Sequence, residues 1–213
     1  TGLHGEEENA SVGYNLARGT MAYPIAHPKV LEAAKEVVRL NPVYLDTETT
    51  GVGLYDVVIE VGIVDHEGNL LYDSLINPER PIPEESSKVN EITDDMVKDA
   101  PTFKEAWPAI EAVLRNRVIG IYNADFDMRL LKQSIEQAGL PWTLNDNQAF
   151  CVMNLFAAWY GEWNKRHSDF KSQKLEFAGR FCQIDLPNSH HAVDDARLTA
   201  VLMRYLADYS KPE

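Results

Sequence analysis

The chain of 213 residues has only two cysteines, Cys151 and Cys182, and no C-x-x-C pair. Two thiols so far apart in the sequence cannot supply a zinc site or a disulfide framework. This scarcity excludes a small secreted fold held together by disulfides. We therefore expect two buried thiols and a reducing compartment, the cytoplasm.

The sequence also lacks a long apolar run. No stretch approaches the roughly 18 apolar residues of a membrane helix, and no basic and apolar leader opens the chain. The 12 Gly and 11 Pro follow no period, which excludes collagen-like and low-complexity chains. Hydrophobic residues make up 45% of the chain and charged residues 25%, so we predict one globular domain that does not associate with a membrane.

Basic residues are in deficit. Lys and Arg number 20 against 33 Asp and Glu, a net charge of −13. A protein that attracts nucleic acid over a broad surface should be basic, so the charge argues against that class of protein. A protein that holds phosphates through bound metal ions is still compatible with this charge.

Three segments of the chain differ in pattern. Residues 1–27 contain an acidic run at positions 6–8 and scattered glycines, which predicts a flexible tail or linker. Residues 28–41 have apolar side chains at helical spacing and predict an amphipathic helix that caps the domain or docks on a neighbour. Residues 42–209 form the main domain. Because the first residue is Thr1 rather than Met, we expect a piece of a longer protein or a processed form.

The main domain alternates between strand and helix patterns. Residues 43–77 predict three consecutive strands, of which 57–64 is apolar enough to be a buried central strand. Prolines 78, 81 and 83 should exclude regular structure from the connection that follows. Further strands are expected within 117–122 and 148–163, and helices at 93–97, 102–114, 125–138, the second half of 148–163 and 192–207. This order predicts an α/β domain with a mixed sheet.

Two carboxylates stand at the end of the first predicted strand. Asp46 and Glu48 should share one face of the strand, about 7 Å apart, while Thr47 lies on the other face. Their repulsion and desolvation require compensation, and hard oxygen ligands favour Mg²⁺ or Mn²⁺. Because an Asp-x-Glu pair can also be solvated, this site needs partners from elsewhere in the chain.

Helix geometry selects one partner from the segment 123–127. Asp127 lies on the helical stripe that carries Leu130 and Ile135, which should face the sheet. Asp125 lies with Arg129 on the outer face, where it fits an N-terminal cap. We therefore expect Asp127 to be the buried aspartate.

The same test separates two aspartates in the last predicted helix. Asp195 shares a stripe with Leu198 and Leu202, whereas Asp194 shares a stripe with Arg197. Asp195 should therefore point inward. A cluster that joins Asp127 and Asp195 to the two strand carboxylates explains all four buried acids at once.

His190 and His191 stand directly before the last helix. A histidine beside a metal site can accept a proton from water, because its ordinary pKa lies near neutrality. A solvent-facing histidine pair is the alternative reading.

Together these segments resemble a known family. Residues 43–51 (VYLDTETTG), 123–127 (NADFD) and 190–196 (HHAVDDA) look like the three exonuclease motifs of the DnaQ-like DEDDh family, which are 3′–5′ exonucleases with a ribonuclease H-like fold. The resemblance covers about residues 42–208 and implies a mixed five-stranded sheet flanked by helices. One departure lies at Asn90-Glu91-Ile92-Thr93, where the family often has His-Gly-Ile-Thr.

The resemblance also implies the site and its chemistry. His190 would be the general base of a two-metal hydrolysis, and two Mg²⁺ or Mn²⁺ ions would be held by Asp46, Glu48, Asp127 and Asp195. The terminal nucleotide would be bound by Thr49, Gly51, Leu54, Asn123 and Phe126, although a core role for Phe126 is an equal alternative. The product would be a nucleoside 5′-monophosphate released from a 3′ end.

The predicted function is a metal-dependent 3′–5′ exonuclease that trims or proofreads mainly single-stranded DNA, fused to or bound by a larger nucleic-acid-processing assembly. An exoribonuclease for RNA end processing is the alternative substrate class. A catalytically silent nucleic-acid- or protein-binding module is the alternative of another class, and the intact acidic set argues against it.

The charge predicts how the chain meets its substrate. Even with two divalent cations bound the chain stays acidic, so we expect weak intrinsic affinity for long nucleic acid and dependence on a partner. Lys165, Arg166, Lys171 and Lys174 form the candidate strand-contacting patch, with an ordinary solvated face as the alternative.

Overall fold

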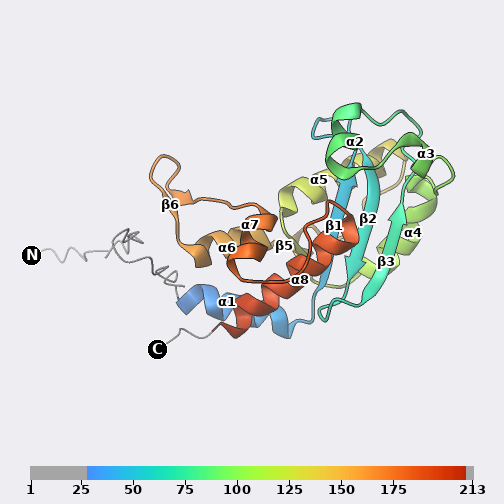
Figure 1. Cartoon of the computed structure of the whole chain (residues 1–213). Coiled ribbons are helices and arrows are strands. Elements are labelled where there is room, and N and C mark those ends of the chain that lie inside the picture. The colour runs from blue at the N-terminus through green and yellow to red at the C-terminus, as the bar shows by residue number, and fades with distance from the viewer. Residues whose placement is uncertain (1–27, 210–213) are drawn as a thin grey trace, which may run out of the picture.

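The computed structural model describes residues 28–209, so the predicted tail at 1–27 lies outside the described residues. A mixed sheet with the strand order β3-β2-β1-β4-β5 forms the centre (Figure 1). Its strands are β1 (Val43–Thr49), β2 (Val58–Val64), β3 (Leu70–Leu75), β4 (Ile119–Ile121) and β5 (Ala149–Cys151). The first three strands pair antiparallel, and β1, β4 and β5 pair parallel, as the predicted fold class requires.

Helices cover both faces of this sheet (Figure 1). They are α1 (Pro28–Arg39), α2 (Glu84–Asn90), α3 (Asp94–Val97), α4 (Phe103–Leu114), α5 (Ala124–Gln137), α6 (Val152–Tyr160), α7 (Leu175–Phe181) and α8 (Ala192–Asp208), with a 3₁₀ turn at Asp146–Gln148. One core joins α1, α6, α7 and α8 to the sheet face that carries Tyr44. The other core joins α4 and α5 to the face that carries Val43 and Leu45. The alternation along β1 thus assigns its side chains to two separate cores.

Local sequence explains where the predicted elements begin and end. β2 is buried along its whole length, as its apolar run predicts. In the β2–β3 hairpin, the Asp65 side chain accepts hydrogen bonds from the backbone N–H and side-chain amide of Asn69. Thr102 and Glu105 form a reciprocal capping box that starts α4.

The amphipathic helix α1 packs on the domain. Ala34 is fully buried, and Val30, Leu31, Val37 and Val38 pack against the core that contains α8. The apolar stripe of α1 is therefore covered by the chain itself.

Some elements were not predicted. The proline-rich connection was expected to lack regular structure, but Pro83 directly precedes α2, because proline is compatible with a helix start and incompatible with a helix interior. Helix α7 and the hairpin β6 (Trp163–Asn164) and β7 (Asp169–Phe170) are too short to show a hydrophobic period. Among the described residues, no helix is both long and apolar enough to span a membrane.

Gly62 sets how closely α8 approaches the sheet. A Cβ atom at Gly62 would lie 2.3 Å from the backbone nitrogen of Val193 and 2.4 Å from the carbonyl carbon of Ala192. Backbone atoms in a first helical turn cannot move aside without shifting the helix. The absent side chain of Gly62 therefore allows the N-terminal turn of α8 to lie directly on β2.

We predict that Gly62→Ala lowers the free energy of unfolding by about 2–3 kcal/mol, because the added methyl overpacks this contact. Gly139→Ala is the control, since Gly139 has a φ of +68° and no atom within 4 Å of an added Cβ. Its cost comes from the backbone alone and should be about 1 kcal/mol. Chemical denaturation measures both values. Equal losses in the two variants would contradict the close packing of α8 on Gly62.

Candidate active site

The site begins at the carboxyl end of β1, in the middle of the sheet. Asp46 and Glu48 are half-buried on the face that α8 covers, while Thr47 is buried on the opposite face. In the register with β2, Asp46 lies opposite Gly62 and Glu48 opposite Glu60. The predicted alternation is therefore present, and both strand carboxylates face the first turn of α8.

Helix α8 brings Asp195 to these carboxylates. The Asp195 side chain is 5% exposed, and one of its oxygens accepts a hydrogen bond from the Asn188 amide. Its other oxygen, Oδ1, is buried and has no hydrogen-bond partner among residues 28–209. Asp194 instead turns toward Arg197 and Ser189, so the inward and outward aspartates are assigned as the helical stripe predicts.

His190 lies beside the carboxylates. Ligand atoms of Glu48, His190 and Asp195 all lie within 4.8 Å of one another. His190 is exposed and has a φ of +55°, a left-handed conformation that is uncommon outside glycine. The side chain of His191 contacts a different acid, because its Nδ1 atom lies 3.8 Å from Oε1 of Glu60. Only His190 of the two joins the group.

Asp127 approaches from the α5 side of the sheet. It is 3% exposed, and its Oδ1 accepts hydrogen bonds from the backbone N–H of Thr47 at 3.1 Å and the Thr47 hydroxyl at 2.8 Å. The buried position of Asp127 was predicted, but its attachment to Thr47 was not. This attachment holds Asp127 to the same strand that carries Asp46 and Glu48.

The cap assigned to Asp125 was wrong. Asn123 is the N-cap residue of α5, and Asp125 is exposed in the first turn. The helix begins one residue earlier than expected, since Ala124 is already helical and buried. An acid in the first turn still interacts favourably with the helix dipole, which accounts for Asp125 without a cap.

The electrostatics of the group follow from burial and repulsion. Burial, and then the charges of Asp127, Asp195, Glu48 and Glu60, raise the pKa of Asp46 well above its usual range. Burial, with Asp195 and Glu60, raises the pKa of Glu48 to about 8. Burial raises the pKa of Asp127 to about 7, against the lowering effect of the Thr47 hydrogen bonds.

The donor set fits a divalent cation. It consists of hard carboxylate oxygens whose repulsion is relieved by positive charge, and the unpartnered Oδ1 of Asp195 supplies a buried acceptor inside it. An apolar or neutral ligand would leave the repulsion between the carboxylates in place.

Sequence reasoning missed two residues beside the site. Glu60 is 7% exposed and accepts a hydrogen bond from the backbone N–H of Ala192 at 2.9 Å. It thus caps the start of α8, because the side chain of the N-cap residue His191 makes no capping hydrogen bond. Asn90 is 2% exposed; it donates to the carbonyl of Thr49, and its hydrogen bond to Glu48 lowers the pKa of that carboxyl. Glu60 could have been suspected as the single acid inside an apolar strand. Asn90 could have been suspected because residues 90–93 depart from the His-Gly-Ile-Thr that is common in the family.

The loop after β1 carries the other predicted contacts. The Thr49 hydroxyl donates to the Gly51 carbonyl, which turns the chain toward an exposed apolar tip. Val52, Leu54 and Tyr55 are 77%, 76% and 82% exposed. Leu54 is therefore exposed at the tip of the loop that follows Glu48.

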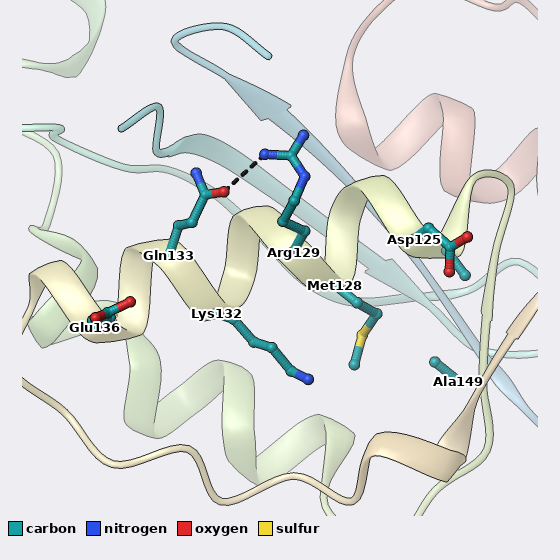
Figure 2. Close-up of a pocket in the computed structure, with 8 residues that line it drawn as sticks. Asp125, Met128, Arg129, Lys132, Gln133, Glu136 and Ala149 are labelled. Carbon is teal, nitrogen blue, oxygen red and sulfur yellow. Dashed lines mark hydrogen bonds between the residues drawn. The ribbon is translucent and has the colours of Figure 1, made fainter. Parts of the chain in front are cut away.

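Helix α5 fastens this loop from outside. Arg129 donates to the carbonyls of Val52 and Gly53, and Gln133 donates to those of Gly53 and Asp56. Arg129 and Gln133 also bond to each other at 2.8 Å, as Figure 2 shows. The loop is therefore held by its backbone while its apolar side chains stay exposed.

The shallow pocket of Figure 2 lies on this outer face of α5 and is lined by Asp125, Met128, Arg129 and their neighbours rather than by the clustered carboxylates. Of the two remaining predicted contacts, Asn123 is exposed at the start of α5. Phe126 is half-buried against the core, with the Arg129 guanidinium 5.4 Å from its ring centre.

Comparison with known proteins agrees with this arrangement. Residues 43–203 match the model of the RNase_T family, described as exonuclease. An uncharacterized exonuclease of Escherichia phage 186 is 32% identical over 189 residues, which cover 86% of this chain and 96% of the phage protein. The PolC-type DNA polymerase III of Caldanaerobacter subterraneus is 31% identical over 162 residues, 74% of this chain but 11% of the polymerase. The chain thus corresponds to nearly all of the phage relative and to a small part of the polymerase.

A solved structure shows the same fold. Escherichia coli exonuclease I in complex with a dT13 oligonucleotide superposes with a TM-score of 0.65 at 16% identity, over 78% of this chain and 40% of that chain. The mixed sheet flanked by helices is thereby established as ribonuclease H-like.

We predict that the metal-free protein loses stability as the pH rises. A carboxyl group with a higher pKa in the folded chain binds more protons when folded, so its contribution is present at low pH and is lost as the pH rises through the folded pKa. For Glu48 the loss runs from the ordinary value of 4.5 to about 8. In EDTA, the unfolding temperature should fall across this range, and Mg²⁺ should restore it more at the alkaline end.

Glu48→Gln is the control for this effect, because the amide keeps the shape of the side chain and removes its titration. The variant should show a flatter pH profile than the parent protein. Parallel profiles for the two proteins would contradict the raised pKa of Glu48.

Proposed function

The chain belongs to the exonuclease family (RNase_T) and is a 3′–5′ exonuclease, and we propose that its substrate is the 3′ end of single-stranded DNA. The related PolC-type protein is a DNA polymerase, and the structural neighbour holds a DNA oligonucleotide. The likeness to the polymerase supports DNA as the substrate class.

The observation that carries the catalytic assignment is the group of Glu48, His190 and Asp195 within 4.8 Å, with Oδ1 of Asp195 unpartnered. Asp46, Glu48, Asp127 and Asp195 would hold two divalent cations, Mg²⁺ or Mn²⁺. When bound, such cations lower the pKa of water and neutralise phosphate charge.

His190 has the exposure and position of a general base. Its ring reaches the carboxylates yet stays open to solvent, so a neutral imidazole can take a proton from the attacking water and pass it to bulk solvent. Asp195 lies beside the ring. The phosphodiester bond to the terminal nucleotide breaks, and the 3′-oxygen of the shortened strand leaves with a proton from solvent.

The exposed loop after β1 would bind the terminal nucleotide. Leu54 offers an apolar surface to a base, while Thr49 and Gly51 fix the backbone that approaches the phosphate. Asn123 and Phe126, at the start of α5, would form the opposite side. Since α5 also fastens the loop, one helix would align both sides of the nucleotide site.

We place the exonuclease domain at residues 42–209, with α1 as its cap. Because the chain matches only 11% of the PolC-type polymerase, we propose that it acts as a trimming or proofreading module within a larger assembly. The two free thiols fit the reducing cytoplasm.

We predict that Asp195→Asn and His190→Ala each lower kcat by at least about 100-fold on a 5′-labelled DNA oligonucleotide with Mg²⁺. Asp194→Asn is the matched control and should leave kcat nearly unchanged, because Asp194 faces Arg197 and Ser189. A ladder of shortened products shows the direction of digestion. Equal losses in Asp194→Asn and Asp195→Asn, or no Mg²⁺-dependent shortening, would reject the assignment.

The same assay on RNA of identical base sequence tests the substrate class. We expect faster digestion of the DNA strand. Faster digestion of the RNA strand would make the protein an exoribonuclease with the same catalytic group.

We predict that Arg129→Met raises KM by about 2- to 10-fold with little change in kcat, because it removes two hydrogen bonds to the nucleotide-binding loop. Lys132→Met is the control on the same helix, since the Lys132 ammonium lies over the Trp142 ring, 5.0 Å from its centre. Initial rates on the labelled DNA strand measure both constants. A fall in kcat without a change in KM would argue against this positioning role.

A further inference from the structure

The β6–β7 hairpin is a basic projection on an acidic protein. Figure 1 shows it extending beyond α6 and α7, away from the five-stranded sheet. Its tip and the segment that returns to the domain carry four cations, Lys165, Arg166, Lys171 and Lys174, all of them exposed. Glu162 and Asp169 are the acids in the same segment, so the hairpin is locally positive while the whole chain has a net charge of −13.

Three of these four cations have no acidic partner. Lys171 lies 3.0 Å from Glu162, whereas no carboxylate of the described residues forms an ion pair with Lys165, Arg166 or Lys174. Six cations elsewhere pair with an acid three or four residues away: Arg39, Lys88, Lys98, Arg115, Arg180 and Arg197. Local pairing neutralises those side chains but leaves the charge of the hairpin available to an external anion.

One face of the hairpin carries two aromatic rings. Trp163 and Phe170 are directly opposite in the strand register, so both side chains project from the same face. Their ring centres are 5.1 Å apart in an edge-to-face arrangement, with exposed fractions of 50% and 36%. Exposed aromatic rings beside unpaired cations are the surface that single-stranded nucleic acids bind, since bases stack on the rings and phosphates meet the cations.

The base of the hairpin is anchored to the residue before the N-cap of α5. The Tyr122 hydroxyl donates to the carbonyl of Gln173, and Tyr122 directly precedes Asn123 at the start of α5. The Gln173 amide also donates to Glu162, which joins the two ends of the hairpin segment. The aromatic and basic surface is thus attached to the same junction of β4 and α5 that positions Asp127.

We propose that the β6–β7 hairpin is an arm that binds the single strand beyond the nucleotides held in the active site. Trp163 stacks a base, and Lys165 and Arg166 contact phosphates. This inference rests on the proposed function, because it assumes that the 3′ end of a nucleic acid occupies the carboxylate site. It gives the acidic enzyme a local means of holding a polyanion that its overall charge repels.

The test compares a long substrate with a short one. Lys165→Glu combined with Arg166→Glu should raise KM for a single-stranded oligo(dT) at least about tenfold. In a plot of the logarithm of the binding constant against the logarithm of the salt concentration, the double variant should also have a slope that is shallower by about 1.4, which is about 0.7 for each lost phosphate contact. Trp163→Ala should raise the same KM about tenfold through lost stacking. Neither variant should change KM or kcat for a thymidine dinucleotide, which is too short to extend beyond the active site.

Lys35→Glu combined with Lys104→Glu is the matched control, because it makes the same change in net charge at exposed positions of α1 and α4. An equal rise in KM in this control, or an equal effect of the arm variants on the dinucleotide, would overturn the proposal. Binding of oligo(dT) measured by fluorescence anisotropy in EDTA separates this test from catalysis. If the parent protein binds oligo(dT) but does not cleave it with Mg²⁺ present, the proposed function fails. The role of the arm is then still tested by comparing oligo(dT) binding between the parent protein and the arm variants.

Discussion

Mutual repulsion among buried carboxylates is the interaction on which the site depends. Asp46 lies in the middle of the central strand β1, and the charges of Asp127, Asp195, Glu48 and Glu60 all raise its pKa. A fold that gathers these acids loses stability unless positive charge joins them. Divalent cations would supply that charge, and the phosphate of a substrate can then enter a site that would otherwise repel it. The carboxylate cluster therefore lowers the stability of the metal-free fold, and the same cluster would hold the cations that catalysis needs.

The surrounding structure fixes each acid by a specific contact. Thr47 holds Asp127 on one face of β1, and Gly62 and Glu60 hold the first turn of α8 on the other face, with Glu60 accepting from the Ala192 N–H. These contacts come from strands in the middle of the sheet, the least mobile part of such a fold. Residues that never touch substrate thus determine the positions of those that would.

Much of this could be predicted from the sequence because its signals are periodic. The alternation in β1 assigned Asp46 and Glu48 to one face, and the helical stripe distinguished Asp127 from Asp125 and Asp195 from Asp194. Contacts between distant segments have no such signal: nothing local pairs Thr47 with Asp127 or Glu60 with Ala192. Short elements were missed for a related reason, since α7 and the strands β6 and β7 contain too few residues for a hydrophobic period to be recognised.

Titration calorimetry with Mn²⁺ tests the central claim most directly, because it measures the compensation of the carboxylates without a substrate. Binding by the parent protein should be retained in Asp194→Asn and weakened at least about tenfold in Asp195→Asn, whose Oδ1 is the unpartnered acceptor. Absence of Mn²⁺ uptake by the parent protein, or equal affinity in the two variants, would contradict the account.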